Sequence, residues 1–214
     1  MAEHPDAAAP FSYWENLIGD IRAAGYTGEL GYFGHLNVDS GWNPFEKIKH
    51  VRGDQGLKNF LALFDFFGIN IQDAIKGKGQ KRNAQSRRAM RQGLKSTFSQ
   101  FKKYNKPFHV TIITPNIHGG VVTGEYIEPC CLEVSLDPKR PRDIEQQADM
   151  YQAVAEVIND PNYAFIRGLN SWGYHLRDDL SKSLRKNDSA YDKSANVRGK
   201  PAEKVLAFWF EVWD

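Results

Sequence analysis

The amino-acid sequence predicts an α/β protein in which helices alternate with the strands of a parallel sheet. Two observations support this prediction. Apolar residues recur at helical spacing in four segments, and between these segments lie short apolar runs bounded by Gly, Pro and polar residues, as expected for buried strands. A parallel neighbour requires a crossover long enough to hold a helix. The helix–strand unit occurs about four times in the 214 residues.

The sequence of the first half of the chain predicts one helix and two strands. Ser12 and Glu15 have the spacing of a capping box, and the apolar residues that follow share one helical face, so we expect a helix at 12–28. The chain then predicts a short strand at 29–37, an irregular or short helical connection at 40–51, and a buried strand at 66–71.

The second half repeats the pattern after a basic loop at 76–83. Pro107 ends a helix that precedes the next strand, and Asp143 is the expected cap of the helix that follows a long polar loop. The predicted elements are a helix at 86–105, a strand at 108–114, a loop at 116–142, a helix at 143–160, a strand at 163–176 and a helix at 200–213.

Length and composition predict a single domain. A chain with 41% hydrophobic residues can bury one core, which we place at 11–214 after a flexible leader at 1–10. No apolar run approaches the ~18 residues that cross a bilayer, and the leader lacks the features of a signal peptide, so we expect a cytoplasmic protein without membrane contact. Cys130 and Cys131 are adjacent and provide no disulfide framework.

Three histidines follow or end predicted strands: His35, His118 and His175. Imidazoles that converge at one rim could hold a metal, but no two of these have the close spacing of a metal motif. Surface or hydrogen-bonded histidines are the favoured interpretation, and we expect His109 to face the helix layer. The sequence therefore predicts neither a metal nor a cofactor.

Positive charge is concentrated in one block. Eleven of the 28 Lys and Arg residues lie between Lys76 and Lys106, with no Asp or Glu among them. Residues 76–103 could therefore bind a polyanion, either a nucleic acid or an anionic polysaccharide, with strong salt dependence. No nucleic-acid fold signature accompanies the block, so a solvated helix face and loop is favoured. The residues of the alternative function are Lys81, Arg82, Arg87, Arg88 and Arg91.

Six stretches of the chain come in a specific order: 13–35, 63–71, 106–114, 145–158, 166–176 and 197–210. The most telling is the tail "GKPAEKVL" after a strand that bears Trp172. Together they resemble the second half of the (β/α)8-barrel glycoside hydrolases of the large retaining clan, from its fifth to its eighth strand. The resemblance implies a TIM-barrel-like half barrel of about four β/α units, with an open three-layer α/β sheet as the structural alternative.

The resemblance implies a carbohydrate-binding surface at the strand ends. In that clan the eighth strand usually presents a tryptophan that forms the floor of a sugar subsite, and Trp172 matches its position. An indole face stacks well on a pyranose, although ordinary packing of this side chain stays open as the alternative. Alternation sets Asn170 and Tyr174 on the same side of the strand as Trp172. His35 and Asn116 complete the predicted substrate-binding residues.

The catalytic carboxylates of that clan do not transfer to this chain. Its nucleophilic Glu ends the seventh strand, where we expect Val110, Ile112 and Thr114 to point inward, and its general acid follows a strand that would precede residue 11. Retaining hydrolysis requires two carboxyl groups ~5 Å apart. We therefore expect the protein either to contact carbohydrate without catalysis, or to have its site completed by another chain, or to hydrolyse glycosides with non-standard loop carboxylates. The candidate catalytic residues are Glu125 and Glu128.

A half barrel cannot close by itself. A closed barrel takes ~250 residues, and four units leave two strand edges and one sheet face exposed. We therefore expect association, either of two copies or with a chain that supplies the missing half.

Overall fold

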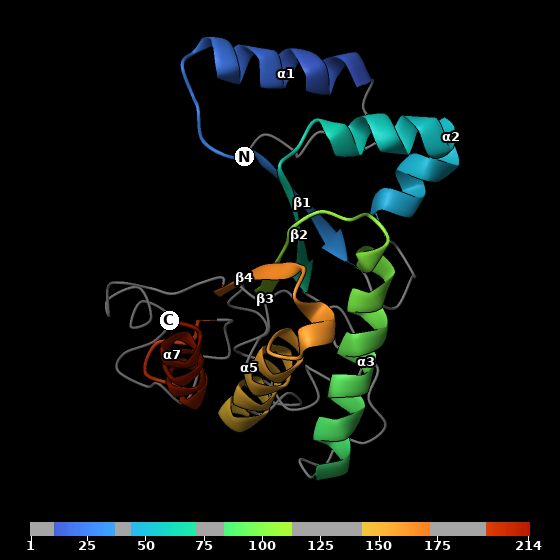
Figure 1. Ribbon diagram of the computed structural model, residues 1–214. Helices are drawn as coiled ribbons and strands as arrows, with labels where there is room; N and C mark the ends of the chain where they lie inside the picture. Colours follow the sequence, from blue (N-terminus) through green and yellow to red (C-terminus); the bar gives the residue numbers. More distant parts are fainter. Residues whose placement is uncertain (1–10, 37–43, 72–83, 113–142, 172–195) are drawn as a thin grey trace, which may run out of the picture.

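The computed structural model describes residues 11–36, 44–71, 84–112, 143–171 and 196–214. The order of their elements confirms the predicted alternation of helix and strand (Figure 1). The elements are α1 (Phe11–Ala23), β1 (Gly31–Leu36), α2 (Pro44–Ala62), β2 (Phe66–Ile71), α3 (Ala84–Lys102), β3 (Phe108–Ile112), α5 (Ile144–Ile158), the 3-10 helix η1 (Pro161–Tyr163), β4 (Ile166–Ser171) and α7 (Pro201–Trp213). Within these ranges, no helix combines the length and apolarity that a membrane span requires.

The four strands form one parallel sheet in the order β1-β2-β3-β4. Each crossover contains a helix: α2, α3 or α5. The register is regular except at a bulge in β4, where Phe108 pairs with Ile166 but His109 pairs with Gly168, so that Arg167 is the extra residue. Strands that follow the chain order without insertion are those of a barrel segment, whereas a doubly wound sheet reverses its order.

One face of the sheet, the helix face, carries the core. Phe45 of α2 lies 5.1 Å from Phe67 of β2 and 6.2 Å from Phe108 of β3, as ring-centroid distances. Phe101 of α3 lies 4.7 Å from Phe108. These four rings are all at most 2% exposed, so the centre of the sheet is closed on this side by α2 and α3.

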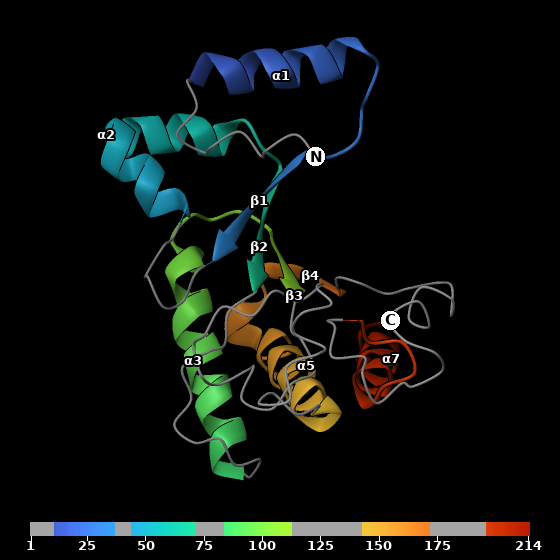
Figure 2. The same ribbon diagram turned by 180° about the vertical axis from the view of Figure 1, so that it is seen from behind.

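The two outer helices lie on the same side of the sheet. Trp14 of α1 packs 5.6 Å from the ring of Tyr32 of β1, and Trp209 of α7 donates a hydrogen bond to Gln152 of α5 at 3.0 Å. Both views show α3, α5 and α7 in succession, with α1 beyond α2 at the opposite end (Figures 1 and 2). A three-layer sheet would need helices on both faces, and the described helices do not cover the second one. The chain is a half barrel of the TIM type.

The connection predicted as irregular or short helical at 40–51 is helical from Pro44, where the 19-residue helix α2 begins. The helix breaks at Gly53, whose φ of 69° and ψ of −179° are not helical. Phe45 and Ile48 are buried before the break, and Leu57 and Phe60 are buried after it. Because the break resets the helical phase, the apolar spacing does not run through the whole helix.

One of the two predicted helix caps is confirmed. Asp143 accepts a hydrogen bond from the backbone N–H of Gln146 at 2.9 Å and so caps α5. The capping box at Ser12 and Glu15 is wrong, because α1 already includes Phe11 and Ser12 therefore lies within the helix. A favourable pair spacing does not define a helix start when the helical pattern extends in front of it.

Candidate functional site

The second face of the sheet, the ring face, is lined by three flat side chains. Phe33 of β1, Phe66 of β2 and His109 of β3 contact one another, with centroid distances of 6.0 Å for Phe33–Phe66, 4.5 Å for Phe66–His109 and 6.4 Å for Phe33–His109. Each is half-buried. This face corresponds to the interior of a barrel, since the helices cover the other one.

The position of His109 corrects the predicted orientation of β3. We expected Val110 and Ile112 to point inward and His109 to face the helices, but Val110 and Ile112 are 0% exposed in the core. The described strand alternates Phe108, Val110 and Ile112 with His109 and Thr111, so its apolar set packs against the helices and its polar set lies on the ring face. Thr114, the third residue expected to point inward, lies outside the described residues.

Glycines make room for the three rings. The Cα atoms of Phe33, Gly68, His109 and Gly168 follow one another as register partners across the sheet. A Cβ atom on Gly68 would lie 2.0 Å from the ring of Phe33, and one on Gly168 would lie 2.4 Å from the imidazole of His109. Each ring therefore lies over the glycine of a neighbouring strand, an alternation of large and small residues that keeps the ring face flat.

A polar row follows the ring row in the direction of the C-terminal strand ends. His35, Asn70, Thr111 and Asn170 are register partners in β1 to β4, and we call these four residues the polar row. Neighbouring strands lie ~4.8 Å apart, so the row spans ~14 Å. In barrel enzymes the active site lies at this end of the strands. The polar row is therefore the candidate functional site.

The structure places two of the predicted substrate-binding residues in the polar row. Asn170 is exposed in β4, and His35 occupies the corresponding position in the backbone of β1. Sequence analysis missed Asn70 and Thr111. Asn70 is the sole polar residue of its strand "FFGINI", which is the signal that could have identified it. The predicted residues Trp172, Tyr174, Asn116, Glu125 and Glu128 lie outside the described residues.

On the described part of the ring face the four strands carry amide, hydroxyl and imidazole groups but no carboxylate. The carboxylate of Glu29, two residues before β1, is near enough to His109 to raise its pKa, though by less than burial lowers it. Burial lowers the pKa of His109, so its imidazole is neutral at pH 7. Neutral groups of this kind exchange hydrogen bonds with uncharged polar ligands. Among the described residues, no three His, Cys, Asp or Glu side chains are grouped to hold a metal ion.

A partly buried hydrogen bond supports the end of β4 from the helix face. The hydroxyl groups of Tyr151 in α5 and Ser171 lie 2.8 Å apart. Tyr151 is 0% exposed, and burial raises the pKa of its phenol, so the group stays protonated. The bond holds the strand end that carries Asn170 against α5.

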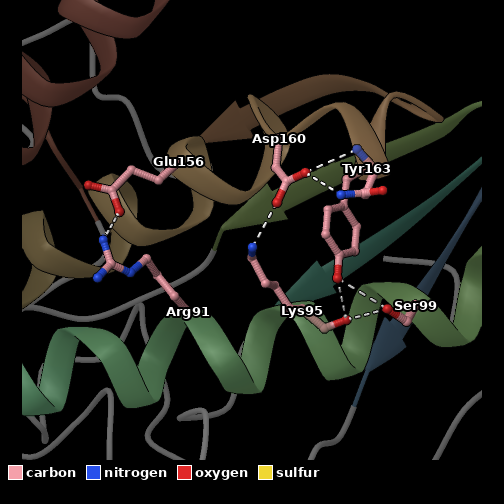
Figure 3. Close-up of polar contacts among 7 residues, drawn as sticks. Arg91, Lys95, Ser99, Glu156, Asp160 and Tyr163 are labelled. Carbon is pink, nitrogen blue, oxygen red and sulfur yellow. Dashed lines mark hydrogen bonds and ion pairs between the residues drawn. The ribbon is translucent and has the colours of Figure 1, made fainter.

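The basic block is in part an interface between helices. Arg91 of α3 pairs with Glu156 of α5 at 2.5 Å, and Lys95 pairs with Asp160 at 2.7 Å (Figure 3). One turn earlier, Arg87 lies 3.7 Å from Asp149. The hydroxyl groups of Ser99 and Tyr163, 3.2 Å apart, extend the contact beyond the ion pairs. Positive charge on this side of α3 is therefore balanced by carboxylates of α5 and by Asp160, which follows α5.

Two of the residues predicted to bind a polyanion take part in these ion pairs. Arg87 and Arg91 face carboxylates of α5, whereas Arg88, which is exposed as Arg87 is, belongs to neither of these pairs. Glu156 also accepts a hydrogen bond from Gln152, which in turn bonds to α7, so the network joins three helices. Lys81 and Arg82 lie outside the described residues. The network favours a structural interpretation of Arg87 and Arg91.

Comparison with known proteins finds similar structures but no match by sequence. No protein-family model and no characterised protein matches the sequence. Two structures of a GH113 β-1,4-mannanase, one of them a complex, are similar to this chain at 19% and 18% identity, with TM-scores of 0.57 and 0.58. Each covers 94% of this chain and 50% of the mannanase chain. A glycoside hydrolase family 5 mannosidase from Rhizomucor miehei aligns at 10% identity and a TM-score of 0.49, over 100% of this chain and 50% of its own.

The mannanase matches define the fold. This chain spans half the length of the mannanase chains it matches, and it has the fold of half a glycosidase-type (β/α) barrel. At identities below 20% the likeness concerns the fold and does not assign an activity.

Proposed function

We propose that this protein is glycoside hydrolase-like and contacts carbohydrate through the C-terminal ends of its four strands. The observation that carries the proposal is the polar row on a fold similar to that of a β-1,4-mannanase. Asn70, Thr111 and Asn170 offer amide and hydroxyl groups that match sugar hydroxyls, and Trp172 supplies the predicted stacking surface. A β-1,4-linked mannan or a related polysaccharide is the proposed ligand class.

Hydrolysis by this chain requires carboxylates that the four described strands lack. Retaining glycosidases use one carboxyl group to attack the sugar and another to protonate the leaving oxygen. We propose that the chain binds sugar without cleaving it, unless another segment completes the barrel and supplies a carboxylate. Hydrolysis of β-1,4-mannan by the chain alone would contradict this, and loss of that activity in Glu125→Gln or Glu128→Gln would identify the acting residue.

Isothermal titration calorimetry with β-1,4-linked manno-oligosaccharides tests the proposed binding. Trp172→Ala should weaken binding about tenfold, because aromatic stacking contributes ~1–1.5 kcal/mol. Asn170→Ala should weaken it about fivefold through the loss of a hydrogen bond worth ~1 kcal/mol. Asn59→Ala is the control, since Asn59 is an exposed asparagine on α2 in the helix layer. Binding that both site variants leave unchanged would refute the proposal.

Polyanion binding through residues 76–103 is the competing function, and salt separates the two. Affinity for heparin or single-stranded nucleic acid should fall steeply with ionic strength, whereas manno-oligosaccharide binding should not. Charge reversal at Arg88 tests an exposed cation of the block without breaking a described ion pair. Tight heparin binding that Arg88→Glu weakens, with no detectable sugar binding, would favour the polyanion function.

A further inference from the structure

An open pocket lies at the opposite end of the sheet from the polar row. It occupies about 410 Å³ between the end of α3, the residues that lead into β3 and the start of β4. Pro107 and Phe165 line it and immediately precede β3 and β4, so it lies at the N-terminal strand ends, whereas barrel active sites lie at the C-terminal ends. We call it the basal pocket and define it by Lys102, Lys106, Pro107, Asn162, Phe165 and Arg167.

Three cations and no carboxylate line the basal pocket: Lys102, Lys106 and Arg167. Neither Lys102 nor Arg167 forms an ion pair with any residue that the structure describes. The carboxylate of Asp160, which precedes η1, is paired with Lys95 at 2.7 Å (Figure 3). The positive charge of the pocket is therefore not balanced by the described protein, and it attracts an anion.

The bulge in β4 presents Arg167 to the basal pocket. Arg167 is exposed and has no register partner in β3. Bulges re-aim a side chain and are common beside functional sites. Lys102 lies in the last turn of α3, where a cation also complements the helix dipole, so it does not by itself indicate a ligand. No contact among the described residues gives Arg167 a comparable role, and the inference therefore depends first on Arg167.

Hydrogen bonds fix the other parts of the basal pocket. Lys106 donates from Nζ to the carbonyl of Phe64 at 2.9 Å. Asn105 has a left-handed φ of 51°, and its N–H donates to the carbonyl of Lys102 at 3.3 Å, which turns the chain back at the end of α3. The first N–H of β3 donates to the carbonyl of Phe165 at 2.8 Å. A pocket held in this way is preorganised, which lowers the cost of binding.

We propose that the basal pocket binds a small phosphate monoester. Three cations match the roughly two negative charges of such an ester better than the single charge of a carboxylate. The planar fork of Arg167 suits two phosphate oxygens, and the ammonium groups add charge. Small-molecule sites occupy ~300–1,000 Å³, so about 410 Å³ leaves room for the organic part, beside the apolar surface of Pro107 and Phe165.

This ligand goes beyond the proposed contact with carbohydrate, because the two sites lie at opposite strand ends. It also differs from polyanion binding through residues 76–103, since Lys106 and Arg167 lie outside that block.

Isothermal titration calorimetry with phenyl phosphate tests the proposal on the 214-residue chain at about pH 8, where the ester is fully ionised. One molecule should bind per chain. Arg167→Ala and Lys102→Ala should each weaken binding about tenfold, because each removes a charge-assisted hydrogen bond, and both side chains are exposed, so the fold should stay intact. Arg167→Lys keeps the charge but not the fork and should weaken binding about threefold. Arg88→Ala is the matched control, because Arg88 is an exposed cation of α3 that does not line the pocket.

Three outcomes would overturn the proposal. The first is that phenyl phosphate does not bind at millimolar concentration. The second is that Arg88→Ala weakens binding as much as Arg167→Ala, since the ester would then respond to the general charge of the protein. The third is that inorganic phosphate binds as tightly as phenyl phosphate, since the site would then take the bare anion and not an ester. The measurement contains no sugar, so its result does not depend on the proposed carbohydrate binding.

Discussion

Gly68→Ala tests the arrangement of rings and glycines on the ring face. The added Cβ would lie 2.0 Å, 2.2 Å and 2.6 Å from three ring atoms of Phe33. Carbon atoms in contact are normally ~3.5–4.0 Å apart, so the ring edge must retreat by ~1.5 Å. Phe33 is half-buried and has Phe66 and His109 as neighbours, so it can move, but not freely.

The expected net effect is a loss of ~1 kcal/mol in the free energy of unfolding. Overpacking of this kind costs ~1–3 kcal/mol, and a value of ~1.5 kcal/mol applies because one side of the ring is open. Replacing glycine with alanine also restricts the unfolded chain, which returns ~0.5 kcal/mol. Gly19→Ala is the control, because Gly19 lies in α1 with nothing within 4 Å of an added Cβ. The same substitution there should stabilise the protein by ~0.5–1 kcal/mol.

Urea unfolding followed by tryptophan fluorescence measures both changes. In the double variant Gly68→Ala and Phe33→Ala, the clash is absent, so the two substitutions should show a coupling energy of ~1 kcal/mol. A Gly68→Ala variant that is stabilised as much as Gly19→Ala, without coupling to Phe33, would show that the ring does not lie over the glycine.

Two further predictions concern the polar contacts of α5. Burial raises the pKa of Glu156, but hydrogen bonds from Gln152 and Arg91 outweigh this effect and hold the pKa below its ordinary 4.5. The stability that this carboxylate contributes is therefore present above pH 4.5 and lost as pH falls through the lower folded-state value, and Glu156→Gln should reduce the acid dependence of the urea midpoint. An unchanged acid dependence would contradict this. Tyr151→Phe should lower the unfolding free energy at pH 7 by ~1 kcal/mol, because it removes the bond to Ser171. Burial raises the pKa of Tyr151 above its ordinary 10.0. The wild type should therefore lose stability from this group as pH rises above 10.0, whereas the variant should not. Urea midpoints of wild type and variant that change equally with pH above 10.0 would contradict this prediction.

The fold was predictable from the sequence because alternation and spacing are local properties. The strand at 66–71 is confirmed with the same bounds, and Asp143 caps α5 as expected. The predicted phase of β3 was wrong although "FHVTI" alternates: the apolar set Phe108, Val110 and Ile112 was assigned to the barrel interior, but Phe108 packs on Phe45 and Phe101 of the helix layer. Tertiary contacts decide such a choice.

The candidate site was predictable only in part for a related reason. Asn170 was predicted from its place beside Trp172, whereas Asn70 and Thr111 join it through cross-strand register, which a single sequence does not encode directly. The ion pairs of Arg87 and Arg91 were missed as well, because their partners lie more than 60 residues away on α5. A block of positive charge in a sequence therefore does not identify a surface of positive charge.

The break at Gly53 fits the long helix α2 to the shorter strand β2. A straight helix of the 19 residues in α2 would extend ~28 Å, whereas the six-residue strand β2 beside it extends only ~20 Å. The turn at Gly53 folds the surplus back, so that Phe45 reaches Phe101 and Phe60 reaches Trp14 from the same crossover. With a residue that favours continuous helix at this position, one of these rings would lie beyond the sheet. The helix between β1 and β2 would then be longer than the strands that it covers.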